Sequence, residues 1–321
     1  INLVRIKGNI YLINSRLHFL EAAILNKKPI RGEKMDIKKV YISSNVDEVV
    51  NILGEYGTKA KIIAGGTDIV IALRNSKIEP DILIDISKME ELKGIKEDDE
   101  YITIGSATTF TEVAESELFK SNLYGLHKAC KMVGSPQIRN KGTIGGNIAN
   151  GSAAADSVPP LMALDSVLTI ISVDGVREVA LEDYYDNPVN EKELLVNIKF
   201  KKAKGNQVLT FAKLGLRKAL AISRLSLSSY IGFEGNRITS IRVTSGALGK
   251  FPMREKEVED YLIGKSLTND TIEAAIEVLR NSMDTRLKGR STLPYKRVAI
   301  STILREILEE AVALGEGVKK W

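Results

Sequence analysis

The sequence predicts an α+β protein with two main domains, and three observations support this fold class. The chain has 321 residues, which is enough for two domains of ordinary size. Up to about residue 205, short apolar strands alternate with segments of helical periodicity. After a polar, turn-like segment at 201–206, strands come first and helices come last. That change of order is typical of an α+β chain with a domain boundary near this segment.

The first domain is expected to begin with a helix at 46–56. Asn45 can cap this helix, Val49 and Leu53 share one of its faces, and Gly57 can end it. The other elements expected here are helical segments at 69–73 and 122–132, and strands at 61–64, 81–86, 101–105, 167–173, 176–181 and 194–200. Asp174-Gly175 is a strong signal for a two-residue hairpin between two of these strands.

The second domain is expected to place three helices after its strands. The strands are predicted at 208–214, 225–233 and 237–244, and the helices at 255–263, 269–283 and 294–314. Thr268 can cap the middle helix, and Pro294 suits the first turn of the last one. Gly264 and Gly315 are expected to end the first and the last helix.

The first 34 residues are interpreted as an extension that carries no chemistry. Ile13, Leu17, Leu20 and Ile24 form a stripe at helical spacing, which favours a short helix packed on the body or on a partner. The stretch that begins at Met35 resembles the natural start of a protein chain. We therefore predict an extension at 1–34, a first domain at 35–205 with parts at about 35–88 and 89–205, and a second domain at 206–321.

Composition excludes several classes of function. The formal charge of +5 resides in residues 1–34, which carry seven basic and two acidic residues, and the remaining chain has 39 of each sign. A neutral body does not favour nucleic acid as a partner. No apolar run approaches the roughly 18 residues of a membrane helix. The single cysteine, Cys130, cannot build a disulfide framework, a zinc site or an iron–sulfur cluster, and it fits a cytoplasmic protein.

The motifs that carry function are two glycine pairs about eighty residues apart. The first lies in Lys61-Ile62-Ile63-Ala64-Gly65-Gly66-Thr67-Asp68, and the second in Thr143-Ile144-Gly145-Gly146-Asn147, with Asp156 nine residues later. One such pair alone is usually a tight turn. Two pairs, each after an apolar segment and each followed by an aspartate, indicate two stretches of backbone against one large anionic ligand.

The residues around the glycine pairs suggest how a nucleotide or flavin would be held. Successive backbone N–H groups in a glycine turn can converge on a pyrophosphate, and Thr67 can donate a hydroxyl to a phosphate oxygen. Asp68 and Asp156 are better suited to accept hydrogen bonds from sugar or ribityl hydroxyls, or from turn amides. Neither pair has the spacing of the Rossmann glycine motif or of the phosphate loop that ends in Gly-Lys-Ser/Thr.

Four segments together resemble the FAD-binding (medium) subunit of the molybdenum hydroxylases, the group of xanthine, carbon monoxide and nicotinate dehydrogenases. These segments, in the order and spacing of that family, are Ile63 to Asp68, Gly134 to Asn147, Asn150 to Asp156, and Phe211 to Arg217. The resemblance spans about residues 36 to 310. It implies a two-part FAD-binding domain of the vanillyl-alcohol-oxidase (PCMH) type, followed by a smaller α+β domain of the carbon monoxide dehydrogenase flavoprotein type.

The resemblance also implies a role for this chain and its site residues. Residues 61–68 would wrap the pyrophosphate and ribityl chain of FAD, with Thr143, Gly145, Gly146 and Asn147 on the other side. Asp156 would accept from a flavin hydroxyl, and Leu195 and Lys213 would lie near the isoalloxazine ring. Electrons would come from a partner iron–sulfur subunit, fed by a molybdopterin subunit, and would leave to NAD or another acceptor. No catalytic acid or base and no metal ligand is expected in this chain, because flavin reoxidation by hydride transfer requires none.

Two other functions remain open from the sequence. The first is a self-contained FAD-dependent oxidoreductase of the same superfamily, although no histidine or cysteine stands beside either glycine pair. The second is a nucleotide-binding or scaffold module in which the glycines serve rigidity alone. His127 and Cys130 are interpreted as packing residues of a helix. Purine, nicotinate, carbon monoxide and aldehyde substrates all remain open, and overall likeness favours purine chemistry.

Overall fold

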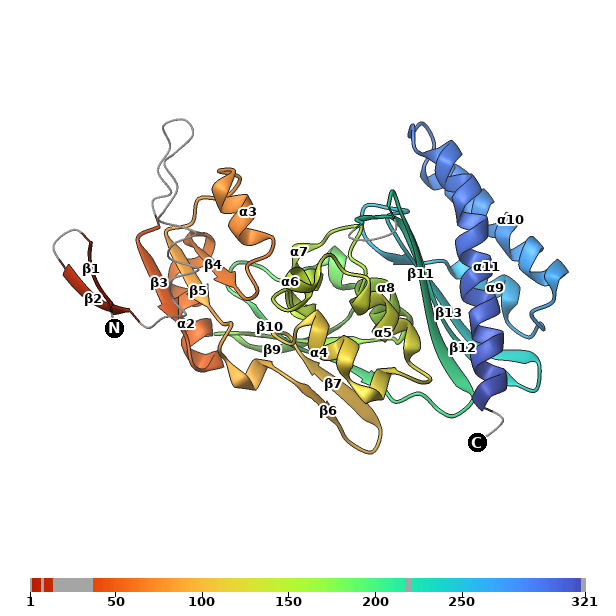
Figure 1. The fold of residues 1–321 in the computed structure, drawn as a ribbon, viewed down its shortest axis with the longest axis horizontal. Coiled ribbons are helices and arrows are strands. Elements are labelled where there is room, and N and C mark those ends of the chain that lie inside the picture. Colours follow the sequence, from red (N-terminus) through yellow and green to blue (C-terminus); the bar gives the residue numbers. More distant parts are fainter. Residues whose placement is uncertain (1, 7–8, 14–36, 218–220, 319–321) are drawn as a thin grey trace.

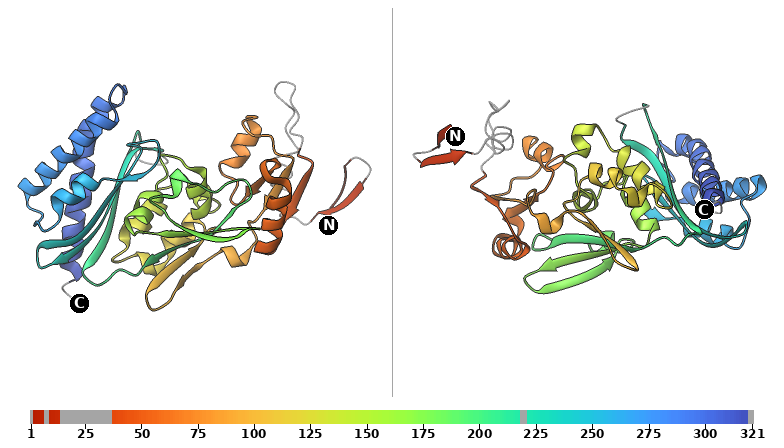
Figure 2. Two further views of the ribbon diagram at one scale, coloured as in Figure 1. Left: turned by 180° about the vertical axis from the view of Figure 1, so that it is seen from behind. Right: turned by 60° about the horizontal axis from the view of Figure 1, so that its bottom comes forward.

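The computed structural model describes residues 2–6, 9–13, 37–217 and 221–318, and its strands form four sheets in that part of the chain. The first is a two-stranded antiparallel sheet of β1 (Asn2–Ile6) and β2 (Asn9–Ile13). The other three follow one another along the chain and also in space (Figure 1). In both views of Figure 2, the three-stranded sheet and the C-terminal helices lie at opposite ends, with the five-stranded sheet between them.

The three-stranded sheet is parallel and has the order β3-β5-β4. Its strands are β3 (Lys39–Ile42), β5 (Ile82–Asp85) and β4 (Ala60–Ile63), and its helices are α2 (Val46–Tyr56) and α3 (Ile69–Arg74). The predicted helix at 46–56 is confirmed, because the Asn45 side chain accepts from the Glu48 N–H at 2.9 Å and Gly57 ends the helix with φ of +51°. The carboxyl end of β4 runs directly into Gly65-Gly66.

The five-stranded sheet is antiparallel, with helices packed against it. Its order is β6 (Ile95–Glu97), β7 (Tyr101–Gly105), β10 (Leu194–Lys201), β8 (Val167–Ser172) and β9 (Gly175–Ala180). The helices are α4 (Phe110–Glu115), α5 (Tyr124–Lys131), α6 (Pro136–Arg139), α7 (Ile144–Asn150) and α8 (Val158–Ala163). The predicted hairpin is confirmed, since Ser172 pairs with Gly175 around the expected turn.

The C-terminal part is a four-stranded antiparallel sheet with three helices. The strands are β11 (Gln207–Gly215), β12 (Ser223–Glu234), β13 (Arg237–Gly246) and β14 (Met253–Arg254), and the helices are α9 (Lys256–Leu262), α10 (Asn269–Arg286) and α11 (Leu293–Val318). Alternate residues of β11 face opposite sides of the sheet. Val208 packs in the core with α10 and α11, whereas Leu209 joins the core of the five-stranded sheet and its helices, which we call the middle layer. This alternation lets one sheet seal two hydrophobic cores.

The structure corrects three expectations from the sequence. Gly145 and Gly146 lie in the first turn of α7 and not in a turn between elements, and α11 continues through Gly315 to Val318. Ile13 belongs to strand β2, and the rest of the proposed helical stripe, Leu17, Leu20 and Ile24, lies outside the described residues. None of the helices in the described ranges is long and apolar enough to cross a membrane.

A buried carboxylate joins three elements of the C-terminal part. Glu255 precedes α9 and is 1% exposed. Its two oxygens each accept a hydrogen bond from the Arg286 guanidinium of α10, both at 2.8 Å, and one also accepts from the Ser245 hydroxyl of β13. A charged group so deeply buried is tolerated because several donors surround it.

We expect Glu255→Gln to lower the free energy of unfolding by about 3 kcal/mol, because it leaves the buried part of the Arg286 guanidinium without a counter-charge. Denaturant unfolding followed by circular dichroism measures this change. Glu257→Gln is the matched control, because Glu257 is an exposed carboxylate in the first turn of α9. An equal loss of stability in both variants would contradict the assignment.

Candidate functional site

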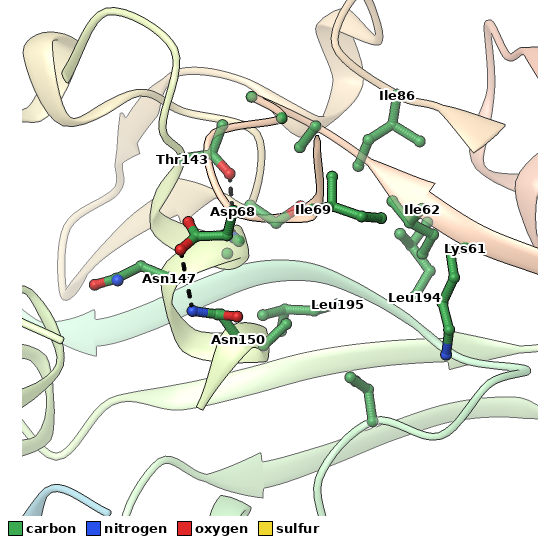
Figure 3. A pocket seen from close by; sticks show the side chains of 18 of the residues that line it. Lys61, Ile62, Asp68, Ile69, Ile86, Thr143, Asn147, Asn150, Leu194 and Leu195 are labelled. Atoms are coloured by element: carbon green, nitrogen blue, oxygen red, sulfur yellow. Dashed lines mark hydrogen bonds between the residues drawn. The ribbon is translucent and has the colours of Figure 1, made fainter. Parts of the chain in front are cut away.

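A cavity of ≈ 470 Å³ lies between the three-stranded sheet and the middle layer (Figure 3). Three segments far apart in the sequence build its walls. The first comprises residues 60–69 with neighbouring side chains of α2, α3 and β5, the second comprises 142–150 with Ser106 and Phe110, and the third comprises 189–195. The cavity is thus lined by both parts of the predicted FAD-binding region.

Most of the site residues predicted from the sequence line this one cavity. They are Lys61, Ile62, Ala64, Gly65, Gly66, Thr67, Asp68, Thr143, Gly145, Gly146, Asn147 and Leu195. Ile63 does not line it, because its side chain is fully buried under the sheet with Leu73 and Leu83. Asp156 and Lys213 also do not line it.

The first glycine pair lies where the turn after β4 comes very close to the backbone at Lys141. A Cβ added at Gly65 would lie 1.8 Å from the carbonyl oxygen of Lys141, so that only glycine fits where the turn packs on the segment before α7. Gly66 has φ of +74°, a conformation that favours glycine. The two glycines therefore fix where the β4 turn sits relative to the middle layer.

The first turn presents a run of backbone amides without partners. No described residue accepts a hydrogen bond from the N–H groups of Gly65, Gly66, Thr67, Asp68 or Ile69, although all five residues line the cavity. Buried or half-buried backbone N–H groups normally have partners in a finished protein. Consecutive free amides beside a cavity are a suitable environment for phosphate oxygens.

The second glycine pair has a different role, because the protein itself uses its amides. Thr143 caps α7 by accepting from Gly146 N–H at 3.1 Å, and its carbonyl oxygen accepts from Asn147 at 3.0 Å. The N–H groups of Ile144 and Gly145 donate to the carbonyl oxygens of Thr108 and Ser106, at 2.9 and 2.8 Å. The amides of this segment are therefore used within the protein, and the segment contributes a wall of the cavity and its side chains.

Polar side chains cross the cavity between its two glycine segments. Asn150 Nδ2 lies 3.5 Å from Asp68 Oδ1 (Figure 3). Thr67 donates its hydroxyl to Asp68 Oδ2 at 3.1 Å. Asn147 is oriented by Ser157, whose hydroxyl donates to Asn147 Oδ1 at 2.8 Å. Asp68 can thus accept hydrogen bonds from ligand hydroxyls on one wall, and the Asn147 side-chain NH₂ can donate to them from the opposite wall.

Asp156 and Lys213 form a buried ion pair at the contact between the middle layer and the C-terminal sheet. Lys213 Nζ lies 2.6 Å from Asp156 Oδ2 and also donates to the carbonyl oxygens of Met132 and Ala221, at 2.8 and 3.2 Å. The Ser223 hydroxyl donates to the other oxygen of Asp156. All three ammonium protons therefore have acceptors, and the predicted flavin contacts of these two residues stay a prediction.

Several cavity residues were missed by the sequence motifs. Leu53, Ile78, Ile86 and Leu194 form an apolar part of the wall beside Ile62, and Val189, Asn190, Glu191 and Glu193 come from the loop before β10. Alternating apolar strands could have indicated the first group, but the loop at 187–193 carries no recognisable motif. Lys61 is the cationic side chain among the lining residues.

Comparisons with known proteins agree with this architecture. The family model described as the FAD binding domain in molybdopterin dehydrogenase matches residues 34–200, and the CO dehydrogenase flavoprotein C-terminal domain matches residues 210–311. The nicotinate dehydrogenase FAD-subunit of Eubacterium barkeri is 31% identical over 286 residues, which cover 86% of this chain and 97% of that protein. The xanthine dehydrogenase FAD-binding subunit of Escherichia coli O157:H7 is 30% identical over 288 residues, which cover 88% and 98%.

A solved structure extends the likeness to the fold. Carbon monoxide dehydrogenase from Hydrogenophaga pseudoflava matches with a TM-score of 0.80 and 26% identity, over 86% of this chain and 97% of that chain. The chain therefore belongs to the family of FAD-binding (medium) subunits of the molybdopterin-dependent dehydrogenases, the molybdenum hydroxylases. The predicted fold class, family and cofactor FAD are confirmed.

The cavity fits FAD on three observations. It has free amides for a pyrophosphate at residues 65–69, an apolar region for a ring, and carboxylate and amide side chains for hydroxyl groups. Ser106, which also lines it, is 4% exposed and its hydroxyl has no partner among the described residues. These features match a ligand with separate charged, apolar and hydroxylated parts.

The two glycine pairs should differ in their tolerance of alanine. We expect Gly65→Ala to lower the free energy of unfolding by about 3 kcal/mol, because its Cβ would collide with backbone at Lys141. Gly146→Ala should change it by about 1 kcal/mol or less, because Gly146 is an exposed helix position where an added Cβ meets only Thr143 Oγ1. Thermal unfolding without added FAD compares the two variants, and equal losses would show that the Lys141 contact does not fix the turn.

Proposed function

We propose that this chain is the electron-transfer subunit of a cytoplasmic molybdenum hydroxylase, receiving electrons from a partner's iron–sulfur clusters and delivering them to NAD or another acceptor. The observation that carries the proposal is the run of free amides at residues 65–69 inside a cavity of a chain that belongs to this family. FAD, when bound, supplies the chemistry, because a flavin can exchange electrons singly or as a hydride.

In this proposal the first wall binds the charged middle of FAD. The amides of residues 65–69 would donate to the pyrophosphate, the Thr67 hydroxyl would change its acceptor from Asp68 to a phosphate oxygen, and the Lys61 ammonium would add positive charge beside the cavity. Ile62 and Ile63 end strand β4, and Ala64 connects the strand to this turn. Asp68 accepts hydrogen bonds from ligand hydroxyls.

The opposite wall would contact the ligand through the first turn of α7 and through the Asn147 side chain. Thr143, Gly145 and Gly146 present the capped first turn of α7, and Asn147 offers a side-chain amide held by Ser157. We propose that Leu195 contacts the isoalloxazine ring, with Asp156 and Lys213 near the ring on the side of the C-terminal sheet.

The chain's own residues bind, orient and exclude water, and none is proposed to act as an acid or a base. Neither a histidine nor a cysteine is among the residues that line the cavity. His127 Nδ1 lies 2.7 Å from the Ala114 carbonyl oxygen, and Cys130 is fully buried, which raises the pKa of its thiol. Both therefore behave as packing residues, as the sequence indicates.

The remaining redox centres are proposed to lie on other subunits. One cysteine cannot hold an iron–sulfur cluster, which supports the proposal that the electrons come from a partner chain. We assign the FAD-binding domain to residues 35–205 and the domain of the carbon monoxide dehydrogenase flavoprotein type to residues 206–321, with an iron–sulfur subunit and a molybdopterin subunit as partners.

The protein, purified with any subunits that accompany it, should be yellow and should release FAD on denaturation. Under anaerobic conditions NADH should bleach its flavin absorbance if NAD is the acceptor, since hydride transfer is reversible. A colourless protein that does not take up added FAD would contradict the proposal. Steady turnover of an organic substrate by this chain in the absence of other subunits would favour a self-contained flavin oxidoreductase instead.

A further inference from the structure

The loop at 187–193 is the third wall of the cavity, and it belongs to neither glycine segment. Val189, Asn190, Glu191 and Glu193 of this loop line the cavity, as do Leu194 and Leu195 at the start of β10. The loop also reaches the three-stranded layer, because a Cβ added at Gly57 would lie 3.8 Å from Lys192 Cε. It therefore lies where the two halves of the cavity meet.

One arginine outside the cavity holds both ends of this loop. Arg177 of β9 donates to the two carboxylate oxygens of Glu193 at 2.8 and 3.0 Å. The same guanidinium lies 3.3 Å from the carbonyl oxygen of Asn187 and 3.4 Å from that of Pro188. A bidentate arginine–carboxylate pair has a fixed relative orientation, so that the two ends of the loop stay at a set separation.

Glu193 also forms hydrogen bonds within the loop, to Asn190. Its carboxylate accepts from the Asn190 N–H at 3.0 Å, and its own N–H donates to the Asn190 carbonyl oxygen at 3.2 Å. The carboxylate is 11% exposed, and the hydrogen bond from Arg177 holds the pKa of Glu193 below its ordinary value. The carboxylate is thus ionised at neutral pH, and the pair with Arg177 persists there.

Beside the polar side chains of this loop, apolar side chains also line the cavity: Leu53, Ala60, Ile62, Ile86 and Leu194, of which Leu194 directly follows the loop. The free amides belong to the 65–69 turn. FAD has a ring system on each side of its pyrophosphate. The isoalloxazine must stay within reach of electron donors and acceptors, whereas the adenine takes no part in the redox chemistry. These apolar side chains, together with the polar side chains of the loop, therefore suit the adenosine half.

We propose that Arg177 is a positioning residue that, through Glu193, holds the 187–193 loop closed over the adenosine half of FAD and so sets the affinity for adenine nucleotides. This inference rests on the proposed FAD site. Arg177 itself does not line the cavity, so its effect must pass through the loop.

The test compares Arg177→Gln with wild type in the purified protein with any accompanying subunits. Three probes separate the parts of the cavity: FAD, ADP for the adenosine half, and inorganic pyrophosphate for the turn at 65–69. We expect FAD and ADP to bind about tenfold more weakly to the variant and pyrophosphate to bind unchanged. Flavin fluorescence reports FAD binding directly, and displacement of FAD reports the other two probes.

Three further variants keep the experiment interpretable. Arg177→Lys keeps the positive charge but cannot form the bidentate pair, so it should bind FAD and ADP more tightly than Arg177→Gln does and more weakly than wild type. Glu193→Gln should show part of the weakening seen in Arg177→Gln. Arg242→Gln, which removes the arginine of an arginine–carboxylate pair with Asp165 at 2.7 Å, is the matched control and should leave all three affinities unchanged. Thermal unfolding of the flavin-free proteins checks that the variants remain folded.

Specific results would overturn the inference. If Arg177→Gln binds all three probes more weakly to the same extent, the substitution has a general effect on the cavity. If its affinities for FAD and ADP are unchanged, the loop does not depend on Arg177 for its position. If wild type fails to bind FAD, the proposed function fails as well. If wild type binds FAD and the variant binds it equally, only the role of Arg177 is refuted.

Discussion

The contact between Gly65 and the backbone at Lys141 is the constraint on which the site depends. A single side-chain carbon at Gly65 would overlap that carbonyl oxygen, so that the β4 turn can rest against the middle layer only when it bears none. This contact places the turn after β4 of the parallel sheet against the segment before α7, a helix that packs on the antiparallel sheet. The cavity exists because the two layers meet there, and the amides of residues 65–69 line it for the same reason.

The two glycine pairs show how similar sequences can have different physical roles. At 65–66 the backbone turns with a positive φ and leaves its amides free for a ligand. At 145–146 the backbone is helical, and its two amides donate to the Ser106 carbonyl oxygen and the Thr143 hydroxyl. Glycine is required at 145 for close packing, since an added Cβ would lie 2.5 Å from Ser106 Cβ.

Local signals predicted the elements whose ends are determined locally. Helix α2 was predictable from Asn45 and Gly57, and the β8–β9 hairpin from Asp174-Gly175, because these residues act on their own neighbours. Helix α7 was not, because Gly145-Gly146 has low helix propensity and the helix depends on carbonyl groups of distant residues. Gly315 likewise remains helical where it packs against Phe233, a contact between distant parts of the chain.

The same distinction explains what was predictable of the site. The turn at 61–68 carries its chemistry in adjacent residues, whereas the pairing of Asp156 with Lys213 and of Arg177 with Glu193 depends on the tertiary fold. Because the walls of the cavity come from three distant segments, the fold also sets the order of folding and cofactor binding. Because the cavity forms only when both layers are folded, FAD bound there as proposed would load after folding and would then hold the two layers together.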